Sequence, residues 1–139
     1  MADTPPRSAL LIIDVQNDFC AGGALEVRGG DRVVPALNRM IERAVARGEP
    51  VYATRDWHPP DTRHFKAFGG TWPVHCVAGT PGARFHPGLR LPDGALVVTT
   101  GDTRDAEGYS AFEGHVPGAR VKVHGKPARV AFHEAVSGA

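Results

Sequence analysis

The stretch Ala9–Val15 has the sequence ALLIIDV, a continuous apolar run that is interrupted only by Asp14 near its end. An apolar run without alternation is typical of a central parallel strand that is covered on both faces. Open α/β sheets bind their ligands at the carboxyl ends of such strands. The run therefore predicts a parallel α/β fold and makes Asp14 the first candidate site residue.

The segment that follows predicts a helix and a second strand. Asp31 is suited to cap a helix, and Gly48 is suited to end it. Between them, apolar residues recur at three- and four-residue spacing, as in an amphipathic helix: Val33, Val34, Leu37, Met40, Ile41, Ala44 and Val45. The stretch PVYATR (50–55) predicts a second strand that runs into Asp56. A parallel crossover of this kind brings Asp14 and Asp56 to one edge of the sheet.

Further elements are predicted toward the C-terminus. ALVVTT (95–100) predicts a third strand, VKV (121–123) a short fourth strand, and AFHEAV (131–136) a last helical turn or two. Residues 57–92 are rich in proline, glycine, histidine and aromatic residues and show no helical or strand period. They predict a long loop, and ordered loops of this length are usually functional.

Length and composition indicate one ordinary globular domain. The chain has 139 residues, of which 42% are hydrophobic and 22% charged, and a domain of this size buries roughly two-thirds of its unfolded surface. No apolar run approaches the roughly 18 residues that span a bilayer, and the polar start lacks the layout of a signal peptide. We therefore expect a cytoplasmic protein without a membrane partner. Two cysteines are too few for a disulfide framework, and a net charge of +1 gives no overall field for nucleic acid.

Aspartate and histidine residues at the predicted sheet edge are candidate metal ligands. Asp56 and His58 are separated by one residue, and a distant histidine in WPVHC (72–76) completes a set of one carboxylate and two imidazoles. Such a set suits zinc, iron(II) or manganese, with positions left open for water and substrate. The spacing alone leaves an alternative, in which these histidines hydrogen-bond the loop backbone. Four aromatic residues nearby are candidates for a pocket or for the core, the more frequent place: Phe19, Trp57, Phe68 and Trp72.

Four motifs in a fixed order resemble the successive signatures of one family. They are LLIIDVQNDFCAGGAL (10–25), ATRDWHPPDTRHF (53–65), GGTWPVHCVAGTPGARFHP (69–87) and GYSAFEG (108–114). Together they are similar to the motifs of nicotinamidase/pyrazinamidase, within the isochorismatase-like cysteine hydrolases. The resemblance implies a three-layer α/β fold with a parallel sheet of the Rossmann type. It also implies hydrolysis of nicotinamide, or a similar aromatic amide, to the acid and ammonia.

The resemblance implies a role for each matching residue. Asp14 matches the catalytic aspartate that accepts the proton of the nucleophile. Asp56, His58 and His75 match the ligands of a divalent metal. His64 matches a further histidine that lies beside the metal or coordinates it in some members. The aromatic side chains that border the pyridine ring in the family correspond to Phe19, Trp72 and Tyr109.

Two features of the chain depart from the family pattern. In the family, the metal binds the pyridine nitrogen directly or through water, and the carboxamide lies over a cysteine thiolate that forms a thioester. Thr100 stands where the family lysine that pairs with the aspartate is expected. The G-x-A-x-D-x-C-V turn that carries the nucleophile is not found in the sequence. We expect Cys20 and Cys76 to be packing thiols rather than substitutes for that nucleophile.

The charge balance changes at Gly114, where the resemblance ends. Residues 1–114 carry 12 Lys or Arg and 14 Asp or Glu, whereas residues 115–139 carry 4 and 1. We therefore expect a nicotinamidase-like portion, 1–114, followed by a basic atypical tail, 115–139, in a frameshifted or truncated gene product. The fold is expected to be incomplete at its C-terminal side. ALLIIDV would then be an exposed sheet edge through which the chain self-associates.

Three functions remain as alternatives. The first is a metal-dependent nicotinamidase. The second is a protein that binds metal and nicotinamide without turnover, because the nucleophile and the lysine are missing. The third is an interaction-only fragment. Another isochorismatase-like cysteine hydrolase is a further alternative, which is disfavoured because D-x-H together with W-P-x-H-C is typical of the nicotinamidase branch.

Overall fold

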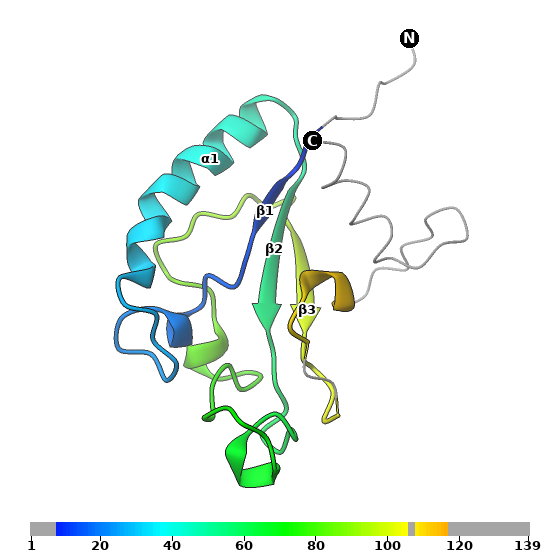
Figure 1. The fold of residues 1–139 in the computed structure, drawn as a ribbon. Helices are drawn as coiled ribbons and strands as arrows, with labels where there is room; N and C mark the ends of the chain where they lie inside the picture. Colours follow the sequence, from blue (N-terminus) through cyan, green and yellow to red (C-terminus); the bar gives the residue numbers. More distant parts are fainter. Residues whose placement is uncertain (1–7, 106–107, 117–139) are drawn as a thin grey trace, which may run out of the picture.

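Three parallel strands form the sheet (Figure 1). The computed structural model describes residues 8–105 and 108–116, and its strands are β1 (Leu10–Ile12), β2 (Val51–Asp56) and β3 (Leu96–Thr100). They lie in the order β1-β2-β3, and both pairings are parallel. The parallel α/β class predicted from the sequence is confirmed. The fourth strand and the last helix predicted at 121–123 and 131–136 lie outside the described residues.

The first strand is shorter than the predicted run, because the backbone turns at Asp14. This residue has a φ of 51°, in the left-handed region that non-glycine residues rarely adopt. Its N–H donates to Thr54, to the carbonyl oxygen at 3.2 Å and to the hydroxyl at 3.1 Å. The prediction of a strand through Val15 is therefore wrong at its C-terminal end. The turn directs the Asp14 side chain away from the regular pleat of β1.

One helix, α1 (Val34–Ala46), connects the first two strands. It is preceded by a one-turn 3-10 helix, Gly30–Val33, and neither helix start has a side-chain cap. The predicted cap at Asp31 is therefore wrong, since the chain enters α1 through the tighter turn. The predicted end at Gly48 is confirmed. Gly48 has a φ of 67°, and Glu49 N–H donates to the carbonyl of Ala44 at 2.9 Å, as in a Schellman motif.

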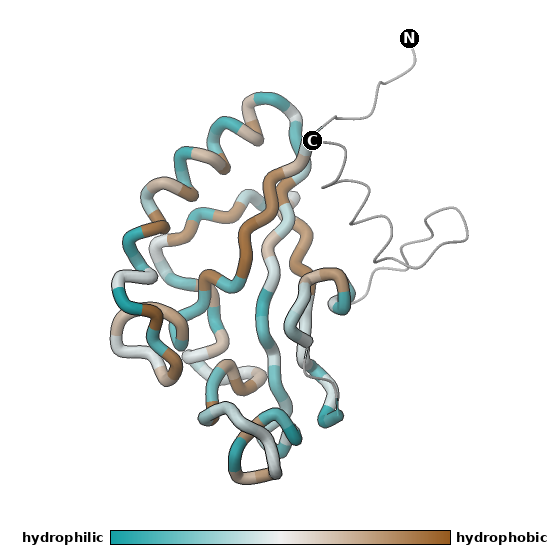
Figure 2. Tube along the Cα trace, viewed as in Figure 1, coloured by the Kyte–Doolittle hydropathy of each residue, from teal (hydrophilic) through white to brown (hydrophobic). Residues whose placement is uncertain are grey.

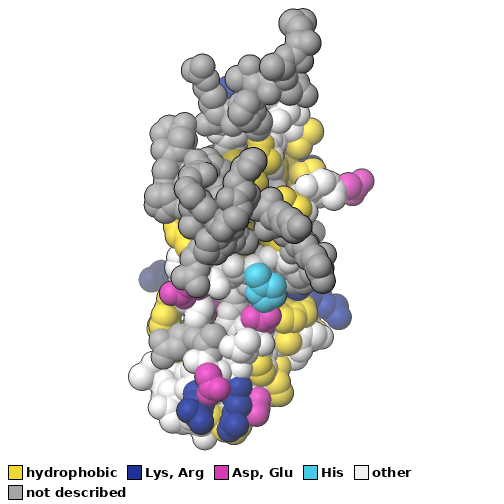
Figure 3. Space-filling view, turned by 90° about the vertical axis from the view of Figure 1, so that its right-hand side faces the viewer, with side chains coloured by type: hydrophobic (Ala, Val, Ile, Leu, Met, Phe, Trp, Pro, Cys, Tyr) yellow, Lys and Arg dark blue, Asp and Glu magenta, His cyan; other side chains and the backbone are white. Residues whose placement is uncertain are grey.

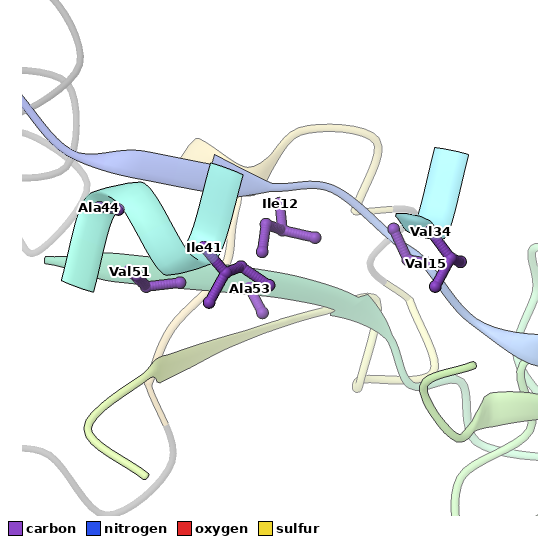
Figure 4. Packing of buried hydrophobic residues seen from close by; sticks show 7 residues of the cluster. All are labelled: Ile12, Val15, Val34, Ile41, Ala44, Val51 and Ala53. Atoms are coloured by element: carbon purple, nitrogen blue, oxygen red, sulfur yellow. The ribbon is translucent and has the colours of Figure 1, made fainter. Parts of the chain in front are cut away.

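The core lies between α1 and one face of the sheet (Figure 4). Val34, Ile41 and Ala44 of the helix pack with residues of β1 and β2 in a cluster of buried side chains, completed by Ile12, Val15, Val51 and Ala53. Not every apolar position of the predicted helix belongs to it, because Met40 is 48% exposed. Figure 2 shows hydrophobic residues running along β1, whereas α1 alternates in character along its length.

The opposite face of β1 is only partly covered within the part of the chain that the structure describes, since Leu11 is half-buried and lines a hollow with Ala111 and Phe112. Ile13, which follows the strand, is 61% exposed. Within the described sheet β1 has one neighbour, β2, so it is an edge strand. The prediction of a central strand covered on both faces is therefore wrong for these residues. At the opposite edge of the sheet, Thr99 of β3 pairs with His115 in an antiparallel bridge.

The first part of the long loop region after β2 lies beyond the carboxyl ends of the strands, and its last part runs back beside α1 to the start of β3 (Figure 1). The region contains two one-turn 3-10 helices, Lys66–Phe68 and Pro81–Ala83; two further ones, Asn17–Phe19 and Ala111–Glu113, lie elsewhere in the chain. Charged side chains gather at this end of the molecule (Figure 3), where Arg63 binds Asp105 at 3.1 Å and Arg104 binds Asp61 at 3.4 Å. Among the described residues no helix has the length and apolar character needed to cross a membrane.

Candidate metal and ligand site

A cavity of about 170 Å³ lies at the carboxyl edge of the sheet. It is lined by most of the residues that the sequence singled out: Asp14, Phe19, Asp56, His64, Trp72, His75 and Tyr109. His58 does not line the cavity, because its side chain is fully buried beneath it. Leu25 and Gly108 complete the wall. The structure thus brings together residues that are up to 95 positions apart in the sequence.

Three histidines converge beside this cavity. The ligand atoms of His58, His64 and His75 lie within 4.8 Å of one another, and all three residues are buried. His58 Nδ1 lies 2.9 Å from the carbonyl oxygen of Gly101, and His75 Nδ1 lies 2.7 Å from that of Pro73. A carbonyl oxygen only accepts hydrogen bonds, so Nδ1 is the donor in both contacts, and Nε2 of each ring is the atom that faces Asp56. Backbone carbonyls orient metal-binding histidines in this way.

The carboxylate of Asp56 faces the same space. Its Oδ2 atom lies 3.5 Å from His58 Nε2 and 3.7 Å from His75 Nε2. Burial alone would raise the pKa of Asp56, but His58, His75 and the hydroxyl of Thr100 hold it below its usual range. Asp56 in turn raises the pKa of His75, although burial of that imidazole opposes the effect. The ionised carboxylate of Asp56 therefore favours a positive charge beside it.

These donors fit a divalent cation. His58 Nε2 is buried and has no hydrogen-bond partner among the described residues, and it points at an ionised carboxylate. A buried polar atom in that state is costly unless a proton or a metal ion satisfies it. Imidazole nitrogens with one carboxylate form the donor set that zinc, iron(II) and manganese accept. The three histidines could therefore bind a metal ion.

Asp14 lies on the β1 side of the cavity. Its Oδ1 atom accepts a hydrogen bond of 2.6 Å from the hydroxyl of Thr54. Burial raises the pKa of Asp14, and the negative charge of Asp56 adds to the effect, while the Thr54 hydrogen bond acts against it. A buried carboxylate of this kind takes up a proton more readily than one in water.

Aromatic rings form the remaining wall. Trp72 is stacked on His64 with ring centroids 6.0 Å apart, and the ring of Phe19 lies 5.8 Å from that of His75. Trp72 Nε1 donates a hydrogen bond of 2.8 Å to the hydroxyl of Tyr109. Phe19 and Trp72 thus face the cavity, whereas Phe68, for which the sequence left the same two alternatives, is exposed and lines no part of it.

Neither cysteine of the chain lines this cavity. Cys76 is fully buried, and Cys20 is buried beside a different hollow. Burial raises the pKa of both thiols. Thiols in such surroundings are poor nucleophiles because the thiolate is disfavoured. Their burial is what packing thiols would show.

Some residues that support the site were not singled out from the sequence. Thr54 and Gln16 contact the two aspartates through hydrogen bonds, but single polar residues in or after a strand carry no distinctive spacing. Gly108 has a φ of 70°, and a Cβ atom there would collide with the backbone nitrogen of Gly101. Its place at the head of the motif GYSAFEG was the one available signal.

The fold and this cavity define a parallel-sheet α/β protein in which three buried histidines could bind a metal ion. The isochorismatase domain matches residues 8–116, and the chain belongs to this family. The resemblance found in the four sequence motifs is therefore confirmed.

Nicotinamidases and pyrazinamidases are among the similar proteins. The nicotinamidase of Escherichia coli (strain K12) is 42% identical over 123 residues, which cover 78% of this chain and 57% of that protein. A structure of pyrazinamidase of Pyrococcus horikoshii in complex with zinc is 44% identical, with a TM-score of 0.74, and the match covers 78% of this chain and 59% of that one. A probable inactive nicotinamidase of Arabidopsis thaliana is 47% identical over 99 residues, or 66% of this chain and 50% of that protein. The chain thus spans less than two thirds of the length of these relatives.

Proposed function

We propose that the chain carries the metal- and amide-binding site of a nicotinamidase, the enzyme that hydrolyses nicotinamide to nicotinate and ammonia. One observation carries the proposal. His58, His64 and His75 converge beside a small cavity that also holds Asp14, Asp56 and two aromatic walls. The names of the relatives, and the zinc in one of their structures, point to the same chemistry.

One group of residues would bind the metal ion, and another would bind the aromatic ring. His58, His64 and His75 would hold a divalent ion together with Asp56. The bound ion would supply a Lewis acid that attracts the pyridine nitrogen, directly or through a water molecule. Phe19 and Trp72 offer flat apolar surfaces against which an aromatic ring packs, with its carboxamide toward Asp14.

Asp14 supplies the proton-transfer group. The Thr54 hydroxyl holds Oδ1, so Oδ2 is the atom left to accept a proton from a nucleophile and pass it to the departing ammonia. A pKa raised by burial suits a carboxylate that must be both base and acid in one reaction cycle.

Among the described residues that line this cavity there is no cysteine to serve as the nucleophile of the family reaction. Cys20 and Cys76 are buried away from the cavity lining, and Thr100 provides no charge at the position of the family lysine. We therefore propose that the residues of this chain bind metal and nicotinamide without efficient turnover by themselves. The placement of the two thiols favours a protein that binds metal and nicotinamide without turnover over an active enzyme.

Elemental analysis tests the metal site, and an ammonia assay tests the absence of turnover. The purified chain should hold zinc, iron or manganese, and a His58→Ala/His75→Ala double variant should hold much less. The loaded chain should bind nicotinamide in a calorimeter but release no more ammonia than the double variant. Metal content no higher than that of the variant would overturn the metal site and leave the interaction-only fragment. Ammonia release that disappears in Asp14→Asn would show that the chain is an active amidase.

A further inference from the structure

Gln16 has a fully buried side chain that pairs with the backbone of a proposed metal ligand. Its Oε1 atom accepts a hydrogen bond of 2.9 Å from Asp56 N–H. Its Nε2 atom donates to the carbonyl oxygen of Asp56 at 2.7 Å and to that of Ala83 at 2.8 Å. The amide thus uses both of its donors and accepts one hydrogen bond, all with backbone groups.

This pairing replaces a missing piece of strand. The chain leaves β1 at Asp14, whereas β2 continues to Asp56. The last residue of β2 would therefore lack a partner on its β1 side. The Gln16 amide bonds both the N–H and the carbonyl of Asp56, as a neighbouring strand does. Asp56 is thereby fixed at its backbone while its carboxylate faces the histidines.

Asp18, two residues further along, holds the other ligand-bearing loop. Its Oδ2 atom accepts a hydrogen bond of 2.7 Å from Cys76 N–H, and its Oδ1 atom accepts one of 3.1 Å from Ala24 N–H. Cys76 follows His75 directly and has a φ of 44°, in the left-handed region. A residue in that conformation needs outside support, since it costs about 1–3 kcal/mol. The carbonyl of Cys76 accepts a hydrogen bond of 2.9 Å from His58 N–H, so this turn joins two of the three histidines.

We propose that Gln16 and Asp18 are positioning residues of the metal site. Gln16 holds the backbone of Asp56 in place, and Asp18 stabilises the turn that joins His75 to His58. Neither side chain lines the cavity, and both act through backbone groups of the ligand-bearing segments. The inference rests on the proposed function, because it needs the histidine cluster to bind a metal ion.

Loss of either side chain should lower the affinity for Zn²⁺ in chains that still fold. Supporting residues around metal ligands typically contribute about 10- to 100-fold to metal affinity. We expect Gln16→Met and Asp18→Ala to weaken Zn²⁺ binding within that range. Asp18→Asn keeps one acceptor oxygen for Cys76 N–H, so it should restore much of the lost affinity. Gln16→Met fills a similar volume, which limits the disturbance of the core.

Asn38 provides the matched control. Its amide also joins two segments, since Oδ1 accepts from Arg90 N–H at 2.9 Å and Nδ2 donates to the carbonyl of Gly88 at 2.9 Å, away from the cavity. Asn38→Ala should lower the unfolding temperature and leave Zn²⁺ affinity within about twofold of the parent chain, because additive effects are usual for distant sites.

The test is competition titration of Zn²⁺ with a chromophoric chelator, on chains that circular dichroism shows to be folded. Visible absorption of the Co²⁺-loaded chains gives a second readout, because its band shape reports ligand geometry. A changed Co²⁺ spectrum and weaker Zn²⁺ binding in Gln16→Met and Asp18→Ala, but not in Asn38→Ala, would support the proposal. Zn²⁺ affinities in folded Gln16→Met and Asp18→Ala equal to that of the parent chain would overturn it. A parent chain that binds no Zn²⁺ would instead overturn the metal site itself.

Discussion

The hydroxyl of Thr100 lies 3.0 Å from Asp56 Oδ1 and donates a hydrogen bond to it. The two residues are direct partners across β2 and β3, and the same hydroxyl lies 3.2 Å from the carbonyl of Arg55. The hydrogen bond to Oδ1 leaves Oδ2 facing His58 and His75. The position at which the family resemblance predicts a lysine is therefore occupied by a residue that supports a proposed metal ligand.

Replacement of Thr100 by valine should weaken metal binding. Valine has nearly the same shape but cannot donate, so Asp56 Oδ1 would lose its partner in a buried place. We expect Zn²⁺ affinity to fall roughly tenfold, at the lower end of the range for supporting residues. Thr99→Val is the control, because Thr99 is equally buried but its hydroxyl accepts from Arg55 Nε at 3.0 Å instead. Similar Zn²⁺ affinities in the two variants would contradict the role of Thr100.

Asp14→Asn should stabilise the metal-free chain at neutral pH. Burial raises the pKa of Asp14, so the folded state holds its proton more firmly than the unfolded state. The ionised carboxylate therefore costs stability above its ordinary pKa of 3.8, and that cost disappears as the pH falls below this value. Asparagine keeps an oxygen for the Thr54 hydroxyl but carries no charge.

Urea unfolding in the presence of a chelator measures this effect. The free energy of unfolding of Asp14→Asn should exceed that of the parent chain at pH 7, and the two values should converge near pH 3.5. Asp61→Asn, at an exposed loop, serves as the comparison because its carboxylate is in an ion pair at the surface. A parent chain that is more stable than Asp14→Asn at pH 7 would contradict the prediction.

Tyr109→Phe should weaken the binding of nicotinamide to the metal-loaded chain. The change removes the 2.8 Å hydrogen bond from Trp72 Nε1, which orients the indole at the cavity wall. The bond is exposed, so its contribution lies near the lower end of about 0.5–1.5 kcal/mol, or roughly two- to fivefold in affinity. Isothermal calorimetry measures the change, and Phe68→Leu is the control on an aromatic residue outside the cavity lining. Unaltered affinity in Tyr109→Phe would show that the hydrogen bond has no part in binding.

The sequence was most informative where a pattern has a physical counterpart. The apolar run of β1, the helical spacing of α1 and Gly48 at its end predicted the parallel α/β order, because burial and backbone freedom act locally. The edge at which Asp14 and Asp56 meet followed from the topology of parallel strands. The place of Asp14 in the cavity was predictable, but its left-handed turn was not, since that depends on hydrogen bonds with Thr54, forty residues away.

The limits of the prediction have the same physical origin. Met40 and Ile41 look alike in the sequence, yet Met40 is exposed and Ile41 buried, because only Ile41 lies on the side of the helix that packs on the sheet. Gln16 and Asp18 act on partners 40 and 58 residues away, through backbone groups that every residue possesses. Such contacts leave no compositional trace. Thr100 was recognisable as a departure from the family motif, but its bond to Asp56 required the register of β2 and β3.

The edge of β1 that no described strand pairs with should make the chain self-associate. Leu10 N–H donates to Pro50 and Asp14 N–H to Thr54, so by the alternation of a strand the backbone groups of Leu11 and Ile13 point away from β2. Ile13 is 61% exposed beside them. A second copy of the same strand, related by a two-fold axis, can supply the missing partners.

Sedimentation velocity should show species larger than a monomer at micromolar concentration, and Ile13→Lys should shift the distribution toward monomer because charge at an edge disfavours pairing. Met40→Lys, on an exposed residue of α1, is the matched control and should leave the distribution unchanged. A sharp monomer peak for the parent chain would contradict association through this edge.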